Sequence, residues 1–164
     1  MADYILITHG TRPLAQRLAR QLPEGKEVLF GAADEMSDVL LRTGHYVRLP
    51  GAKSPAFAHE MLKICLDYGV SLLLPLGREE QLALLEAKIL FEEYGIAVLL
   101  PEKSVFDVVP RFEDPSVGLP FLILEKGRLV GQYHERYEGT DAGFSGVFVQ
   151  SDSGQELAFC AISG

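Results

Sequence analysis

The chain has 164 residues, of which 48% are hydrophobic and 23% are charged, a balance typical of a globular protein rather than a disordered or fibrous one. Its 15 basic and 23 acidic residues give a net charge of −8, which argues against binding to nucleic acid or to an anionic membrane, because both attract basic surfaces. No apolar run reaches the ~18 residues needed to cross a bilayer, and we expect no signal peptide. The only cysteines, Cys65 and Cys160, sit in apolar surroundings, so the sequence predicts a cytoplasmic protein with two buried, reduced thiols.

The first 110 residues are predicted to alternate between strands and helices. Continuous apolar runs predict strands that are buried on both faces, and apolar residues at helical spacing predict the connecting helices. The expected strands are 4–8, 27–31, 46–49, 71–75 and 96–100. The expected helices are 13–22, 36–42, 54–68, 78–94 and 102–109, the fourth with Leu82, Leu85, Ile89 and Leu90 facing inward. This order predicts right-handed crossovers and an α/β fold with an open parallel, Rossmann-like sheet flanked by helices.

The composition changes after Pro110. Residues 111–120 are polar and rich in turn formers. The remainder predicts four short strands, 121–125, 129–135, 146–150 and 157–162, with hairpin turns at 126–128 and 151–154. We therefore expect an α/β domain of residues 1–110 and a small antiparallel β-rich extension of residues 111–164. The extension is expected to pack on the parallel sheet or on a second subunit.

Candidate ligand-binding residues lie in three loops that follow predicted strands, at 9–12, 33–35 and 76–80. Ligands of open parallel sheets bind beyond the carboxyl ends of the strands, where the strand order reverses. The residues singled out are His9, Gly10, Thr11, Arg12, Asp34, Gly77, Arg78 and Glu80. Arg12 and the start of the following helix could bind an anion, although a surface loop with a solvated arginine is the alternative.

Two other interpretations of these loops remain open. A dinucleotide site needs three glycines in the first loop, and only Gly10 is present, although Asp34 stands where an acid could hold a ribose. NAD(P) binding is therefore the weaker alternative. Glu79 and Glu80 open the long helix, where the helix dipole favours acidic residues, so helix capping competes with ligand contact.

Metal binding and nucleophilic catalysis are not expected. The histidines are never paired at the spacing of metal ligands. No serine lies in a nucleophile-elbow motif, and neither cysteine has an obvious partner base. The sequence therefore predicts no catalytic residues, no metal site and no cofactor.

Several segments together resemble a known family. They are Tyr-Ile-Leu-Ile-Thr at 4–8, Val-Leu-Phe-Gly-Ala-Ala-Asp at 28–34, Leu-Leu-Leu-Pro at 72–75 and Gly-Ile-Ala-Val-Leu at 95–99. This pattern is similar to the pre-ATP-grasp domain, the Rossmann-like N-terminal domain of ATP-grasp ligases, and the resemblance covers residues 4–109.

The extension resembles part of the ATP-grasp domain itself. Residues 119–126 are similar to the strand that carries a nucleotide-contacting lysine, and residues 132–141 to the hinge strand against which adenine lies. The resemblance implies that Lys126 would face phosphate, and that Glu135 and Glu138 would face the adenosine of a nucleotide.

The departures from the family predict that its activity is lost. Only residues 127–134 separate Lys126 from Glu135, where the family has a much longer stretch with a glycine-rich lid. The chain also ends at Gly164, before the family's metal-holding residues. Because phosphoryl transfer depends on these parts, we expect neither ligase activity from this chain alone nor a bound ATP-Mg.

The leading functional prediction is a non-catalytic module, derived from an ATP-grasp protein, that binds an unknown small molecule or a partner protein. Its cleft would lie between the three loops, with Arg12 as the anion contact. One alternative is a subunit of a split ATP-grasp ligase whose catalytic half is a separate chain. Another is a structural homo-oligomer, such as a homodimer, whose C-terminal strands pair across a two-fold axis.

Overall fold

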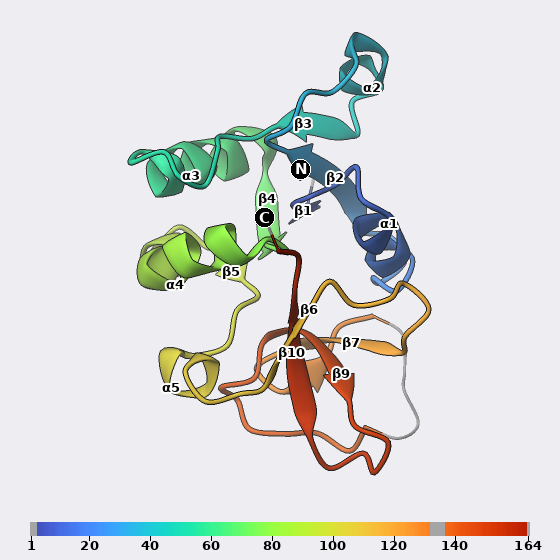
Figure 1. The fold of residues 1–164 in the computed structure, drawn as a ribbon. Helices are drawn as coiled ribbons and strands as arrows, with labels where there is room; N and C mark the ends of the chain where they lie inside the picture. The colour runs from blue at the N-terminus through green and yellow to red at the C-terminus, as the bar shows by residue number, and fades with distance from the viewer. Residues whose placement is uncertain (1–2, 132–136, 164) are drawn as a thin grey trace.

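The computed structural model describes residues 3–131 and 137–163, which form an α/β fold with two five-stranded sheets (Figure 1). The strands of the first sheet are β1 (Tyr4–Ile7), β2 (Glu27–Ala32), β3 (Tyr46–Arg48), β4 (Val70–Leu74) and β5 (Ala97–Val98). All of them are parallel, in the order β3-β2-β1-β4-β5. The predicted open, parallel, Rossmann-like sheet is confirmed.

Helices cover both faces of this sheet. The helices of the chain are α1 (Pro13–Ala19), α2 (Asp38–Arg42), α3 (Phe57–Tyr68), α4 (Arg78–Glu93) and α5 (Lys103–Phe106), of which α2 buries no residue and α5 packs Phe106 against Phe159 of the second sheet. Figure 1 shows α1 on one side of the sheet and α3 and α4 on the other. The side chains of β1 alternate accordingly, because Ile5 and Ile7 belong to the apolar cluster of α1, while Leu6 belongs to that of α3 and α4.

The inward face of α4 differs from the prediction. The helix buries Glu80, Gln81, Leu84 and Phe91. Leu82 and Ile89 are 46% and 71% exposed, so their predicted inward orientation is wrong. The inward positions include polar residues: Gln81 Nε2 donates to the Pro75 carbonyl at 3.0 Å, and Lys88 Nζ to the Leu100 carbonyl at 2.9 Å. Leu85 and Leu90 are half-buried against the apolar cluster, as predicted, so counting apolar residues alone identifies only part of the inward face.

The second sheet contains a strand that was not predicted. Its members are β6 (Arg111–Glu113), β7 (Phe121–Glu125), β8 (Arg128–Leu129), β9 (Gly146–Gln150) and β10 (Leu157–Ala161), in the order β6-β10-β9-β7-β8. Its neighbours are antiparallel except for β6, which is parallel to β10. Every residue of β6 is exposed, and its three residues, Arg-Phe-Glu, are too few for their alternation to indicate a strand, so only the pairing with β10 identifies it. Most of the predicted strand 129–135 lies outside the described residues.

Both predicted hairpin turns are present. Lys126 and Gly127 have φ angles of 51° and 79°, as the two central residues of a type I′ turn require. In the turn between β9 and β10, the Gly154 amide donates to the Ser151 carbonyl at 2.8 Å. The local turn residues thus determine where these strand pairs reverse direction.

The second sheet packs directly on the first. One apolar cluster joins Leu6 and Phe91 to Phe148, and the other joins Leu18 to Cys160. The buried Gln21 amide, just after α1, donates to the Phe121 carbonyl at 2.9 Å. Packing on the parallel sheet, one of the two arrangements expected for residues 111–164, is thus present among the described residues.

Two sequence-based expectations about environment can be compared with this fold. Cys65 and Cys160 are free and buried, as predicted. Across residues 3–131 and 137–163, no helix combines the length and the apolar character that a bilayer crossing needs.

Candidate functional site

A small cavity lies where the order of the first sheet reverses, at the carboxyl ends of β1, β2 and β4. Its volume is about 150 Å³, and its lining residues are His9, Ala33, Asp34, Ala52, Gly77, Arg78, Glu79 and Glu80. The structure therefore brings together the predicted residues His9, Asp34, Gly77, Arg78 and Glu80. This position is the usual ligand site of an open parallel sheet.

The buried carboxylate of Glu80 is part of the lining of this cavity. Glu80 is only 5% exposed, and its Oε1 accepts a hydrogen bond from the Gly77 amide at 3.1 Å. The same oxygen lies 3.4 Å from His9 Nε2. Burial raises the pKa of Glu80, and the interactions with His9, Thr8 and Gly77 offset part of that rise. The carboxylate thus joins the loop after β1 to the loop after β4.

The loop geometry places His9 against Gly77. His9 has a φ of 51°, a left-handed conformation that few residues other than glycine adopt. A Cβ on Gly77 would lie 2.3 Å from His9 Nε2 and 2.8 Å from Glu80 Oε1. Glycine at position 77 is therefore what allows the imidazole and the buried carboxylate to meet.

The mouth of the cavity is acidic. Asp34 follows β2 and is exposed, and its carboxylate makes no hydrogen bond or ion pair with any other residue that the structure describes. Glu79 Oε1 lies 3.9 Å from Lys53 Nζ, and Glu113 Oε1 lies 3.2 Å from the Arg78 guanidinium. Because Glu113 already offsets the charge of Arg78, the mouth suits an ammonium group or hydroxyl groups better than an anion.

The remaining residues of the first loop lie outside the cavity lining. Arg12 is the exposed residue before α1, and its side chain makes no capping hydrogen bond. The pKa of Asp114 is lowered, mainly by hydrogen bonds from Ser163 and to a smaller extent by the charge of Arg12. Thr11 is exposed. The structure therefore does not bring Arg12 or Thr11 to the cavity formed by the other candidates.

Gly10 has a packing role in this loop. Its amide donates to the Gly31 carbonyl at 2.9 Å, and a Cβ there would lie 2.5 Å from the Cβ of Phe30. The loop can therefore approach β2 closely only because position 10 has no side chain.

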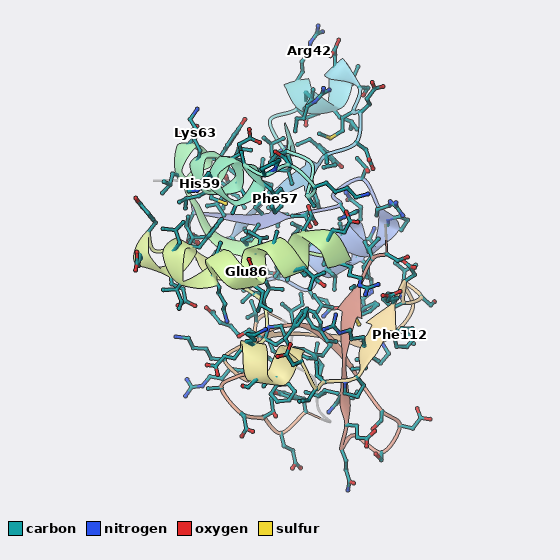
Figure 2. The ribbon with its side chains drawn as sticks, turned by 60° about the vertical axis from the view of Figure 1, so that its left-hand side comes forward. Arg42, Phe57, His59, Lys63, Glu86 and Phe112 are labelled. Atoms are coloured by element: carbon teal, nitrogen blue, oxygen red, sulfur yellow. The ribbon has the colours of Figure 1, made fainter. Side chains whose placement is uncertain are left out.

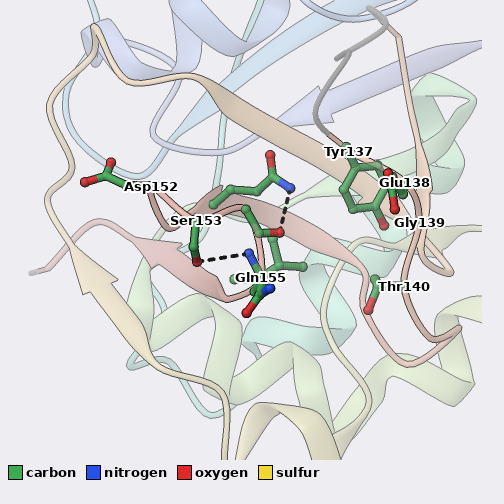
Figure 3. Close-up of a pocket in the computed structure, with 10 residues that line it drawn as sticks. Tyr137, Glu138, Gly139, Thr140, Asp152, Ser153 and Gln155 are labelled. Atoms are coloured by element: carbon green, nitrogen blue, oxygen red, sulfur yellow. Dashed lines mark hydrogen bonds between the residues drawn. The ribbon is translucent and has the colours of Figure 1, made fainter.

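A larger cavity, which the sequence did not predict, lies in the second sheet (Figure 3). Its volume is about 560 Å³, and segment 137–140 faces the turn between β9 and β10 across it. Its walls are a loop and a turn from separate parts of the sequence, so no local sequence pattern predicts it. The lining residues are Tyr137, Glu138, Gly139, Thr140, Gln150, Asp152, Ser153, Gly154, Gln155 and Leu157.

The residues implied by the ATP-grasp resemblance do not share one cavity. Glu138 lines the 560 Å³ cavity, whereas Lys126 lines another of about 540 Å³ together with Arg128. Glu135 lies outside the described residues. No group of three or more histidine, cysteine, aspartate or glutamate side chains in the described part of the chain is arranged to hold a metal ion.

No model of a known protein family matches this chain, and no curated protein is found as a relative. The resemblance to the pre-ATP-grasp domain therefore stays a prediction, and functional inference depends on the geometry of the site.

Proposed function

We propose that this chain is a non-catalytic module that binds a small polar ligand at the carboxyl ends of β1, β2 and β4. The observation that carries the proposal is the cavity at the reversal point of the first sheet, where Asp34 has no partner among the described residues. A carboxylate in that position accepts hydrogen bonds from an ammonium group or from paired hydroxyl groups.

The charge of the lining favours a cationic or hydroxyl-bearing ligand over the anion expected from Arg12. Asp34 and Glu79 lie at the mouth, and Glu80 lies beneath them. The only basic side chain among the lining residues of the described chain, apart from His9, is Arg78, and it is paired with Glu113. A phosphate here would face more carboxylates than cations.

The two cysteines give no support for nucleophilic catalysis by a thiolate. Burial raises the pKa of Cys65 and of Cys160 to about 12, so neither forms the thiolate that nucleophilic attack needs. His9 is engaged with Glu80. Lys126 and Glu138 line different cavities, so the described residues give no support to a nucleotide site formed by these two side chains.

The test is a thermal-shift and NMR titration of the purified chain against ethanolamine, ethylenediamine, glycerol, D-ribose, inorganic phosphate and ATP-Mg. A ligand at ~100 times its dissociation constant adds ~2.7 kcal/mol of stability, which is a shift of a few degrees for a chain of this length. We expect a response from the amines or the hydroxyl compounds. Chemical-shift changes are expected at His9, Asp34 and Gly77.

A matched pair of variants localises the binding. Asp34→Asn removes the free carboxylate from the cavity, and we expect it to weaken binding at least about tenfold because a hydrogen bond to a charged group is lost. Asp38→Asn makes the same change on α2, outside the cavity, and is expected to bind normally. Binding of ATP-Mg that depends on Lys126 would instead favour the nucleotide alternative, and silence across the panel would favour a protein partner.

A further inference from the structure

The second sheet has an open edge at β6. This strand is the last of the sheet, with β10 on one side and no strand of the described chain on the other. Figure 2 shows Phe112 at the outline of the molecule, beside β6. Phe112 is 40% exposed, and both its neighbours in the strand are exposed as well. An exposed edge of this kind is a template for pairing with another strand.

The backbone groups that face outward are those of Arg111 and Glu113. The hydrogen bonds from Phe159 N to the Pro110 carbonyl (2.7 Å) and from Asp114 N to the Ala161 carbonyl (2.8 Å) show that even-numbered residues face β10. Successive residues of a strand direct their backbone groups to opposite sides. The N–H and C=O groups of Arg111 and Glu113 therefore point outward, and no backbone partner for them occurs in the described residues.

This pattern matches an antiparallel pairing of β6 with itself. In a two-fold arrangement centred on Phe112, Arg111 lies opposite Glu113 of the partner subunit, and the reverse pair is formed by symmetry. Each such pair exchanges two hydrogen bonds, from N–H to C=O in both directions. The outward groups of both residues are then all satisfied.

The side chains select this register over its neighbours. Arg111 and Glu113 carry opposite charges, so each cross-strand pair is attractive. A shift that centred the two-fold axis on either residue would place like charges opposite each other. Phe112 would face Phe112 of the partner subunit across the non-hydrogen-bonded position, where side chains approach most closely and aromatic pairs are favourable.

We propose that a second copy of this chain docks on the β6 edge and forms a two-fold dimer with one continuous sheet through both subunits. The proposal does not require a ligand in the cavity after β1 and β4, although Glu113 also pairs with Arg78 of that lining. Asp114 has a φ of 49° and ends the strand, which limits the pairing to three residues in each copy. Such a short ladder makes the dimer weak.

A charge-swap series tests this pairing on the full chain by sedimentation velocity, from about 1 μM to about 1 mM. Arg111→Glu and Glu113→Arg each place like charges opposite one another, and we expect each to weaken the dimer at least about tenfold because two symmetric pairs become repulsive. The double variant R111E/E113R exchanges the charges and restores attraction. Its dimer is expected to recover to near the wild-type affinity.

The double variant also separates pairing from folding. Arg111 lies 4.1 Å over the ring of Phe106, and Glu113 pairs with Arg78, so the single changes also disturb contacts within the subunit. The double variant loses those same contacts, and only the cross-subunit attraction can rescue it. Circular dichroism establishes that each variant is folded, and Glu93→Arg at the end of α4 is a control that should dimerise normally.

Three outcomes would overturn the proposal. The wild-type chain could remain a monomer across the whole concentration range. The single variants could dimerise as well as the wild type, which would place any dimer contact elsewhere. The double variant could fail to associate better than the single variants.

Discussion

At the scale of single residues, the candidate site depends on how closely two loops approach each other. The Thr8 hydroxyl oxygen accepts a hydrogen bond from the Leu76 amide at 2.8 Å, and Glu80 accepts one from the Gly77 amide at 3.1 Å. Both interactions are buried, where the loss of a hydrogen-bond partner costs more than at the surface. The loops after β1 and β4 therefore form one unit, and residues of both loops line the candidate cavity.

A methyl group at position 77 should disrupt this unit. Gly77 has a φ of −81° and a ψ of 138°, which alanine adopts without strain, so the cost of Gly77→Ala comes from its contacts with His9 and Glu80. We expect a loss of about 1–3 kcal/mol in the free energy of unfolding. Gly51→Ala is the control, because nothing lies within 4 Å of its Cβ and its change should stay within about 1 kcal/mol. Urea unfolding of both variants checks the difference, and equal stabilities would contradict the crowding argument.

The buried Glu80 should make stability depend on pH. Its pKa is raised in the folded chain above the ordinary value of 4.5, so the folded state holds this proton more tightly than the unfolded state. This contribution is fully present below about pH 4.5 and is lost as pH rises through the folded pKa. We expect the stability of the wild type relative to Glu80→Gln to fall as pH increases from 4.5 to 7.

Urea unfolding at several pH values measures this dependence. Glu79→Gln is the control, because the side chain of Glu79 is half exposed and lies outside the buried cluster. The difference in the free energy of unfolding between the wild type and Glu79→Gln should not fall as pH rises. If the stability of the wild type relative to Glu80→Gln rose with pH, burial would not raise the pKa of this carboxyl.

At the scale of elements, the short hairpin of β7 and β8 joins turn chemistry to tertiary packing. Gly127 has a φ of 79°, and a Cβ there would lie 2.3 Å from the Thr140 carbonyl oxygen. Its amide donates to the Phe144 carbonyl at 2.8 Å. The turn therefore supports segment 140–144 as well as reversing the chain.

Two glycine-to-alanine substitutions separate these contributions. Gly127→Ala combines the strain of a positive φ, about 1–2 kcal/mol, with the backbone collision at Thr140. Gly154→Ala has the same kind of strain, with a φ of 76°, but nothing lies within 4 Å of its Cβ. We expect Gly127→Ala to destabilise the chain by at least about 1 kcal/mol more than Gly154→Ala. Thermal unfolding compares the two, and equal losses would show that the hairpin yields to the added methyl group.

At the scale of the whole molecule, the two sheets share their cores. Each apolar cluster contains side chains from both sheets, and the strand β10 leads into Ile162, which forms a bridge with Gly77 beyond the end of β4. The Ile162 amide donates to the Leu76 carbonyl at 2.7 Å, and the Arg78 amide donates to the Ile162 carbonyl at 3.0 Å. The C-terminal strand thus stabilises the loop that carries half of the candidate site.

Shared cores predict that the two sheets unfold together. Cys65 on α3 and Cys160 on β10 are both buried, one beside each sheet, and provide natural reporters of local opening. Pulsed alkylation across a urea gradient, read by mass spectrometry, should give coincident transitions for the two thiols. Earlier labelling of Cys160 would show that residues 111–163 open as a separate unit.

The parallel sheet, most of its helices and both hairpin turns can be predicted from the amino-acid sequence alone. Buried parallel strands are continuous apolar runs, and glycine at a positive φ is a local requirement that needs no tertiary information. The sequence also located the loops of the candidate site, since His9, Asp34 and Glu80 follow or begin predicted elements. Tertiary structure decided which of those residues meet, because the distance between two loops depends on the packing of the strands that carry them.

Three features were decided only by the folded chain. The strand β6 exists because β10 pairs with it, although its three residues are too few to indicate a strand. The inward face of α4 includes Gln81, because backbone carbonyls of Pro75 and Cys160 meet its amide there. Glu80 is buried because of the loops that surround it. From the sequence alone, an acidic residue in the first turn of a helix is predicted to be an exposed capping residue. In each case part of the environment comes from residues distant in sequence: β10 for β6, Cys160 for Gln81, and Thr8 and His9 for Glu80, and local sequence does not predict these contacts.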